Sequence, residues 1–187
     1  MESETPVKDV LYQEITKLSE KKIISEISKK NSPEIINKII SKCFQKILQM
    51  SGKRDENFGI LAESLMHYLM TISLIPSQRK VSVDNLDLDI VIPDLKLLNE
   101  KPADSLIISF PKTENIEEIN QRITEIKKMT SPENIWVVLH TDLPVNAKRY
   151  LIGTENDSFN NILEDITKFL SKRKQSKFKI FRNKGVI

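Results

Sequence analysis

The 187-residue chain has a single cysteine, Cys43, so an internal disulfide is excluded. It has only four glycines, and none of them forms the glycine-rich pattern of a phosphate-binding loop or a dinucleotide-binding turn. No G-x-S-x-G nucleophile motif occurs, and the two histidines and one cysteine do not have the spacing of zinc ligands. The sequence therefore argues against disulfide scaffolds, P-loop or dinucleotide-binding enzymes and structural zinc domains.

Long apolar runs are also absent. No stretch approaches the roughly 18 apolar residues of a transmembrane helix. The first 20 residues alternate charged and apolar side chains, unlike the continuous apolar run of a signal peptide. The lone cysteine lies among isoleucines at helical spacing, which favours an inert core thiol. Together these features predict a cytoplasmic protein with no membrane partner.

The net charge of the chain is small, but the charged residues are unevenly distributed along it. The net charge of +3 does not by itself indicate a polyanionic partner, but from Lys168 to the C terminus there is no Asp or Glu. Phe169, Phe178 and Phe181 lie among the basic residues, and such a mixture can contact phosphates and stack on bases. The alternative is a solvated helix end followed by an edge strand over 178–181. The predicted nucleic-acid contacts are Lys172, Arg173, Lys174, Lys177, Lys179, Arg182 and Lys184.

Helical periodicity dominates the first part of the chain. Residues 7–29 and 35–48 carry apolar side chains at helical spacing, with a phase shift near Lys21, and a Ser-Pro pair between them suits a helix start. We therefore expect a helical hairpin over 1–52, followed by an α/β core with a basic tail over 53–187. The hairpin's apolar stripe must cover the core or another subunit. It comprises Ile36, Ile39, Ile40, Phe44 and Ile47.

The period of the pattern changes after a third amphipathic helix over 55–75. Alternating or wholly apolar short runs then predict strands, with an amphipathic helix over 116–126 before the last strand and another over 159–170 after it. The fold class is accordingly α/β, with a mixed β-sheet of about four strands flanked by helices. The strands are expected over 80–83, 86–92, 106–110 and 135–139.

Carboxylates occupy distinctive places in this order. Glu63 lies on the third helix, and Asp89 directly precedes the apolar half of the second strand. In element order and in these residues, roughly 55–140 resembles the core of the restriction-endonuclease-like, or PD-(D/E)xK, nuclease superfamily. Members carry a helix carboxylate, an Asp on the second strand and an E-x-K or D-x-K on the third. The resemblance implies that Asp89 and Glu63 are metal ligands, with Ser109 and Lys112 beside them in the catalytic site.

The third strand departs from the superfamily pattern. Cleavage of a phosphodiester needs Mg²⁺ or Mn²⁺ held by converging carboxylates, with a lysine to orient water or offset charge. Ser109 replaces the carboxylate, Pro111 stands where the lysine belongs, and Lys112 follows one place late, on the opposite face of a regular strand unless a bulge intervenes. The candidates to replace the missing group are Glu63, Glu114, Glu117, Glu118 and Gln121.

The leading hypothesis is a nucleic-acid-interacting protein whose nuclease-like core is catalytically degenerate and whose partners are DNA or RNA. If the site is active, it would perform Mg²⁺- or Mn²⁺-dependent cleavage; otherwise no cofactor is expected. Each of these residues also has an interpretation without a catalytic role. Asp89 would lie on a solvated strand face, Glu63 would form a surface pair with His67, and Lys112 would be a solvated residue at a strand end. The competing hypothesis is a non-catalytic interaction or assembly module, binding a second copy or a protein partner through the N-terminal hairpin.

Overall fold

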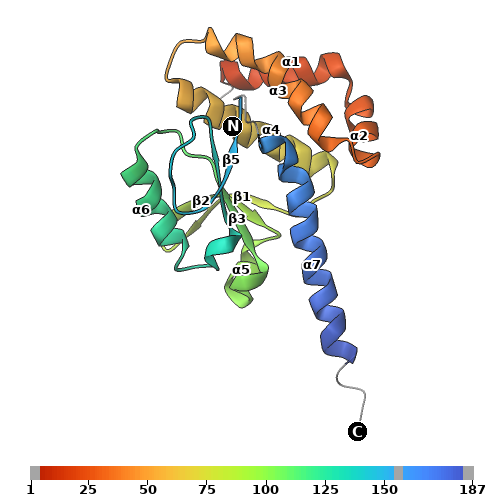
Figure 1. Ribbon diagram of the computed structural model, residues 1–187, viewed down its shortest axis with the longest axis vertical. Coiled ribbons are helices and arrows are strands. Elements are labelled where there is room, and N and C mark those ends of the chain that lie inside the picture. The colour runs from red at the N-terminus through yellow and green to blue at the C-terminus, as the bar shows by residue number, and fades with distance from the viewer. Residues whose placement is uncertain (1–4, 154–157, 183–187) are drawn as a thin grey trace.

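The structure is a computed structural model that describes residues 5–153 and 158–182, with the backbone alone over 173–182. Within these residues the strands form one sheet in the order β1-β2-β3-β4-β5 (Figure 1). Strands β1, β2 and β3 are antiparallel neighbours, whereas β3, β4 and β5 run parallel. This mixed sheet confirms the predicted α/β class. The strands are β1 (Gln78–Val83), β2 (Leu86–Ile92), β3 (Leu106–Ser109), β4 (Ile135–Leu139) and β5 (Lys148–Leu151).

Helices cover both faces of the sheet. The helices of the described residues are α1 (Pro6–Leu18), α2 (Glu20–Ser28), α3 (Ser32–Leu48), α4 (Arg54–Ile72), α5 (Leu95–Glu100), α6 (Ile116–Ile126) and α7 (Ile162–Arg182). Side chains such as Ile108 and Trp136 pack with the N-terminal helices, α4 and α7 in one core. Their strand neighbours Ile107 and Val137 face the other way, into clusters completed by α5 and α6. Successive side chains of β3 and β4 point to opposite faces of the sheet, and both faces are buried under helices.

The N-terminal hairpin consists of three helices where two were expected. The break between α1 and α2 falls at Ser19, whose φ is +68°, close to the phase shift in the apolar pattern near Lys21. The α3 stripe is buried within the chain except for the half-buried Phe44, whose ring lies 5.5 Å from that of Phe58. Cys43 is fully buried, and burial raises the pKa of its thiol to about 12. The domain boundary after residue 52 stays a prediction.

The edge strand predicted over 178–181 is wrong, because the backbone there is helical and α7 continues to Arg182. Alternating Phe-Lys-Ile-Phe suggested a strand, but residues 171–182 contain neither glycine nor proline to end a helix that has already begun. The fifth strand of the sheet is instead β5, in a segment where no strand was predicted. Only Tyr150 in β5 is fully buried, so the sequence of β5 has no alternating or continuous apolar pattern that would predict a strand.

Helix α7 is attached to β5 through Asp165. Its carboxylate accepts hydrogen bonds from the Tyr150 hydroxyl at 2.7 Å, Lys148 Nζ at 2.9 Å and Lys168 Nζ at 3.2 Å. Burial raises the pKa of Asp165, but these three donors together outweigh it and leave that pKa below its usual range. The charged form of Asp165 is therefore stabilised by folding. In the described part of the chain, no helix combines the length and apolarity needed to cross a bilayer.

Replacing Asp165 with asparagine tests this attachment. Because the folded-state pKa is depressed, the carboxylate contributes stability above its unfolded pKa and loses it as the pH falls through the folded pKa. We expect Asp165→Asn to lower the free energy of unfolding by about 1 kcal/mol at neutral pH, with a smaller difference below about pH 4. Urea unfolding of both proteins at several pH values measures this. A difference independent of pH would contradict the charged role.

Candidate nuclease-like site

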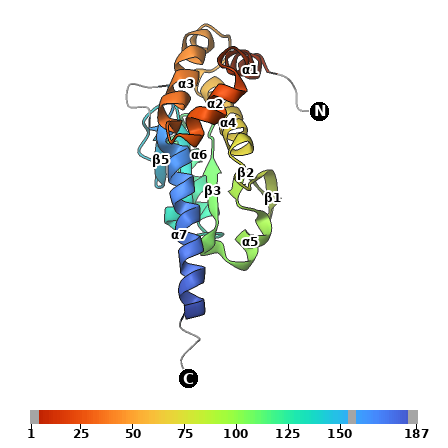
Figure 2. The same ribbon diagram turned by 90° about the vertical axis from the view of Figure 1, so that its right-hand side faces the viewer.

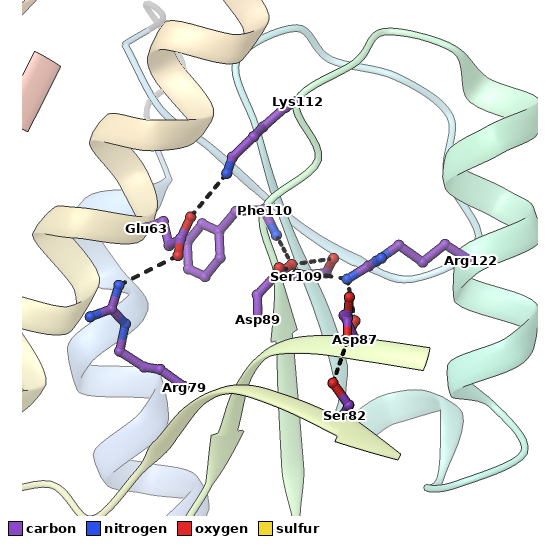
Figure 3. A network of polar contacts seen from close by, with 9 residues as sticks. All are labelled: Glu63, Arg79, Ser82, Asp87, Asp89, Ser109, Phe110, Lys112 and Arg122. Atoms are coloured by element: carbon purple, nitrogen blue, oxygen red, sulfur yellow. Dashed lines mark hydrogen bonds and ion pairs between the residues drawn. The ribbon is translucent and has the colours of Figure 1, made fainter. Parts of the chain in front are cut away.

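The pairing of β2 with β3 brings Asp89 and Ser109 together. Ile90 pairs with Ile108 in the antiparallel register, so the preceding Asp89 lies opposite the following Ser109. Asp89 Oδ2 accepts hydrogen bonds from Ser109 Oγ and from the Phe110 backbone N–H, both at 2.9 Å (Figure 3). The predicted neighbours thus meet, but Ser109 donates a hydrogen bond to the carboxylate and adds no second negative charge.

An arginine from α6 lies on the other side of Asp89. Arg122 Nη2 is 3.6 Å from Asp89 Oδ1 and also donates to the Asp87 carbonyl oxygen (Figure 3). The buried Ile119 and Ile123 hold this face of α6 against the sheet. Sequence reasoning missed Arg122, although it lies one turn after Glu118 on the helix expected beside the site. The guanidinium of Arg122 therefore neutralises Asp89, the carboxylate that the superfamily pattern assigns as a metal ligand.

Glu63 is the second carboxylate expected in the site, and it too is paired with cations. It projects from α4, is only 7% exposed, and therefore does not belong to a surface pair. Its Oε1 lies 3.4 Å from Arg79 Nη2 of β1, and its Oε2 lies 3.3 Å from Lys112 Nζ (Figure 3). Arg79 was not predicted as part of the site. A buried carboxylate held by two basic groups is compensated without a metal ion.

Glycine at position 59 explains how Lys112 reaches Glu63. Strand β3 ends at Ser109, so strand alternation no longer decides the direction of the Lys112 side chain. A Cβ at Gly59 would lie 3.0 Å from the Pro111 carbonyl oxygen and 3.2 Å from Lys112 Cγ. The segment after β3 therefore passes close to the bare backbone of α4, one turn before Glu63. Because β3 ends before Lys112, the opposite-face placement of a regular strand does not apply, and Lys112 lines the same cavity as Ser109.

Backbone strain lies beside Asp89 as well. Lys80 of β1 falls opposite Asp89 in the register, since Arg79 pairs with Ile90, and its φ is +49°. Leu88 and Val91 pack in the same cluster although they are three residues apart, so the alternation of β2 is interrupted between them. A left-handed backbone at a non-glycine residue costs of order 1–2 kcal/mol and is concentrated at functional sites.

A cavity of about 190 Å³ opens between Asp89, Ser109, Lys112 and Arg122. Of the proposed replacement carboxylates outside α4, Glu118 lines this cavity. Glu114 instead accepts a hydrogen bond from Thr141, and neither Glu117 nor Gln121 lines the cavity. No cluster of three or more His, Cys, Asp or Glu side chains able to hold a metal occurs among the described residues. The cavity therefore has two carboxylates, of which Asp89 is paired with Arg122, and it lacks the strand carboxylate that the superfamily pattern places at position 109.

No family profile and no curated protein sequence matches the chain. Among solved structures, the chain is similar to the restriction endonuclease PspGI bound to substrate DNA, with a TM-score of 0.53 at 15% identity over 90% of this chain and 94% of that one. The fold is restriction-endonuclease-like. The chain is also similar to metal-depleted Ecl18kI in complex with uncleaved, modified DNA, with a TM-score of 0.45 at 14% identity over 89% of this chain and 62% of that one.

The predicted basic region lies elsewhere on this restriction-endonuclease-like core. Lys172 lines a cavity of about 480 Å³ together with Trp136, Lys148 and Phe169. Lys148 Nζ lies 4.2 Å from the centroid of the Trp136 ring, a cation–π contact. Of the other predicted contacts, Arg173, Lys174, Lys177, Lys179 and Arg182 have a described helical backbone but no described side chain, and Lys184 lies outside the described residues.

The nuclease-like site and the base of α7 lie at opposite ends of the sheet. Ser109, the last residue of β3, lines the 190 Å³ cavity beside Asp89. Ala103 and Asp104, which precede β3, line the 480 Å³ cavity beside α7. Both views show α7 continuing past the end of the sheet (Figures 1 and 2). Among the residues with described side chains, Lys172 and the nuclease-like site therefore do not share a cavity.

Proposed function

We propose that this chain binds nucleic acid through a restriction-endonuclease-like core that no longer cleaves. The observation that carries the proposal is the pairing of Arg122 with Asp89 at 3.6 Å and of Lys112 with Glu63 at 3.3 Å. Asp89 and Glu63, the two carboxylates that the superfamily pattern assigns to the metal, are each neutralised by a basic side chain of the same chain. The site keeps the architecture of a nuclease centre but has internal cations in place of open metal ligands.

The chemistry of the donors supports loss of cleavage. Mg²⁺ requires near-octahedral oxygen coordination and gives up its water ligands reluctantly. Asp89 Oδ2 already accepts two hydrogen bonds, and its Oδ1 faces Arg122, so a metal ion would have to displace the guanidinium. Ser109 supplies a neutral hydroxyl where the superfamily has a carboxylate. Glu118, the other carboxylate at the cavity, lies on α6 and not on β3, so with Asp89 paired to Arg122 no pair of open strand carboxylates fixes an ion that could activate water.

Nucleic-acid binding is supported by two independent features. One solved structure that is similar to this chain over 90% of its length, PspGI, is a complex with substrate DNA. Helix α7 contains no acidic residue after Asp165, and its second half is rich in lysine and arginine. The cavity beside the first half of α7 is lined by Lys148, Lys168 and Lys172, by the acidic Asp104, Glu133 and Asp165, and by the apolar ring of Phe169, and Lys148 and Lys168 are paired with Asp165. Lysines contribute affinity through phosphates, and aromatic rings add stacking.

Cleavage and binding assays test the two halves of the proposal separately. Labelled DNA and RNA, single- and double-stranded, are incubated with the protein in Mg²⁺ and in Mn²⁺, beside Asp89→Ala. We expect no cleavage above background by either protein. Metal-dependent cleavage that disappears in Asp89→Ala would overturn the degenerate assignment. Failure to bind any of the four nucleic acids at low salt would overturn the binding half.

Charge neutralisation on α7 tests where nucleic acid binds. We expect the triple variant Lys172→Gln, Arg173→Gln, Lys174→Gln to weaken binding at least tenfold and to reduce the slope of log K against log salt by about 3, roughly one unit per lost phosphate contact. Fluorescence anisotropy over a salt series measures both. The matched control removes three exposed lysines from the N-terminal helices, Lys21→Gln, Lys22→Gln and Lys38→Gln. Equal losses in the two triples would show a non-specific effect of net charge.

A further inference from the structure

Two cations that line the cavity beside Asp89 have more donors than their partners use. Within the described residues Arg122 makes polar contacts through Nη2 alone, toward Asp89 Oδ1 at 3.6 Å and toward the Asp87 carbonyl oxygen. A guanidinium has five N–H donors, and this side chain is 33% exposed where it lines the cavity. Lys112 lines the same cavity and has three donors, with one carboxylate contact, to Glu63. Both side chains can therefore donate to a further group.

The ion-pair network around this cavity carries an excess of positive charge. Three basic side chains contact only two carboxylates, because Arg79 and Lys112 share Glu63 while Arg122 pairs with Asp89 (Figure 3). The charges of one cation are therefore not matched by a carboxylate of its own. The network favours an anionic group in the cavity over a second cation.

Glu118 is the remaining carboxylate that lines the cavity. It lies in the first turn of α6, and its side chain is exposed at the rim. An exposed side chain can turn toward solvent, so Glu118 weakens the attraction for an anion without occupying the space. Its removal should accordingly strengthen the binding of an anion, whereas the removal of a metal ligand would weaken the binding of a metal ion.

The size and the donors of the cavity suit one phosphate group. Its volume of about 190 Å³ is below the roughly 300–1,000 Å³ of sites for drug-sized molecules, so it is too small for a whole nucleotide. The Thr113 hydroxyl also lines it, accepts the Asn115 N–H at 3.1 Å and keeps its own proton to donate. A guanidinium, an ammonium and a hydroxyl around one small space match the oxygens of a phosphate.

We propose that the Arg122 guanidinium bridges Asp89 and a backbone phosphate of the bound nucleic acid, and that Lys112 contacts the same phosphate. The inference rests on the proposed function and states how this site holds its ligand. In a metal-dependent nuclease an ion links the carboxylates to the phosphate. A guanidinium can make the same link, with one edge toward Asp89 and the other toward two phosphate oxygens. It supplies no activated water, so the phosphate is held and not attacked.

Binding should therefore need no divalent metal ion. Fluorescence anisotropy with a labelled DNA duplex measures the affinity in EDTA and in Mg²⁺ at equal ionic strength, and we expect the same Kd in both. Arg122→Gln should weaken binding about tenfold and reduce the slope of log K against log salt by about 1. Glu118→Gln should strengthen binding by about two- to threefold, because it removes a negative charge at the rim.

Arg149→Gln is the matched control. Arg149 also contacts one carboxylate, that of Asp142 at 3.1 Å, and donates to one backbone carbonyl, that of Leu143, but it lies outside the cavity. This variant should bind almost as tightly as the unmodified chain. Equal losses in Arg122→Gln and Arg149→Gln would overturn the proposal, since net charge alone would then explain them. Binding that requires Mg²⁺ would also overturn it, because the ion would then make the bridge.

Inorganic phosphate tests the contact without nucleic acid. In ¹⁵N-labelled protein the Nε–Hε resonance of Arg122 is identified by its absence from the spectrum of Arg122→Gln. Titration with phosphate at constant ionic strength should shift this resonance to saturation and leave that of Arg149 in place. An unshifted Arg122 resonance would contradict the proposal even in a chain that binds DNA. A saturable shift in a chain that binds no nucleic acid would disprove the proposed function and leave the phosphate site standing.

Discussion

Arg122→Glu is expected to give the cavity beside Asp89 an affinity for Mn²⁺ that the arginine prevents. The substitution removes the guanidinium 3.6 Å from Asp89 Oδ1 and places a carboxylate one turn after Glu118, which lines the same cavity. Three carboxylates then face one space, so the metal-free variant is destabilised by like-charge repulsion. Mn²⁺ at about 100 times its dissociation constant should stabilise the variant by about 2.7 kcal/mol. Thermal unfolding with and without Mn²⁺, reversed by chelator, measures the effect.

Two controls make the Arg122→Glu result specific. Arg149→Glu changes an arginine of β5 that pairs with Asp142 and lies outside the cavity. This variant should show no response to Mn²⁺. Adding Asp89→Ala to Arg122→Glu should abolish the response, because the central ligand is lost. If the unmodified chain were stabilised by Mn²⁺ as strongly as Arg122→Glu, the arginine would not be what excludes the ion. The proposed reason for the loss of cleavage would then be wrong.

Gly153→Ala is expected to lower the free energy of unfolding by about 3 kcal/mol, from left-handed strain and overpacking together. Gly153 has φ of +70°, and a Cβ there would lie 2.8 Å from Phe58 Cε1 and 3.1 Å from Phe44 Cδ2. Phe58 cannot retreat, because it is fully buried and its ring stacks on His140 with centroids 3.9 Å apart. The expected fall in thermal midpoint is about 10 °C for a chain of this size. Differential scanning calorimetry measures it directly.

Gly52→Ala separates the two causes of the Gly153 effect. Gly52 also has a left-handed backbone, with φ of +100°, but the nearest atom to its added Cβ is Asn57 Oδ1 at 3.8 Å. It therefore reports backbone strain without crowding, and we expect about 1–2 kcal/mol. Equal losses in the two variants would show that packing against the two phenylalanine rings contributes nothing.

The sheet could be predicted wherever burial on both faces leaves a simple signal. The runs of β3 and β4 are almost wholly apolar because helices cover both sides, and both strands were predicted. Edge strand β5 has exposed lysine and arginine and a single fully buried Tyr150, so it resembles a loop. The helical end of α7 was missed because Phe178 to Phe181 alternates, while the continuity of the preceding helix decides its conformation.

The candidate site was predictable in Asp89, Glu63, Ser109 and Lys112 but not in its two arginines, Arg79 and Arg122. Asp89 and Ser109 were assigned from the resemblance to the superfamily pattern, and the antiparallel register sets them opposite each other. Arg122 reaches Asp89 only because α6 packs over that edge of the sheet, and this tertiary placement leaves no local pattern. Lys112 reaches Glu63 because Gly59 admits the segment after β3, a contact between parts of the chain about fifty residues apart.

Under the proposed function, the separation of the nuclease-like site and the α7 cavity by the length of the sheet sets a minimum footprint on nucleic acid. Strand β4 has five residues, which at about 3.3 Å each extend roughly 17 Å between the two ends. A duplex rises 3.4 Å per base pair along each strand, so about five base pairs are needed to reach from one end to the other. Shorter oligonucleotides can occupy one region at a time, and ligands longer than this gain the second contact as an intramolecular step.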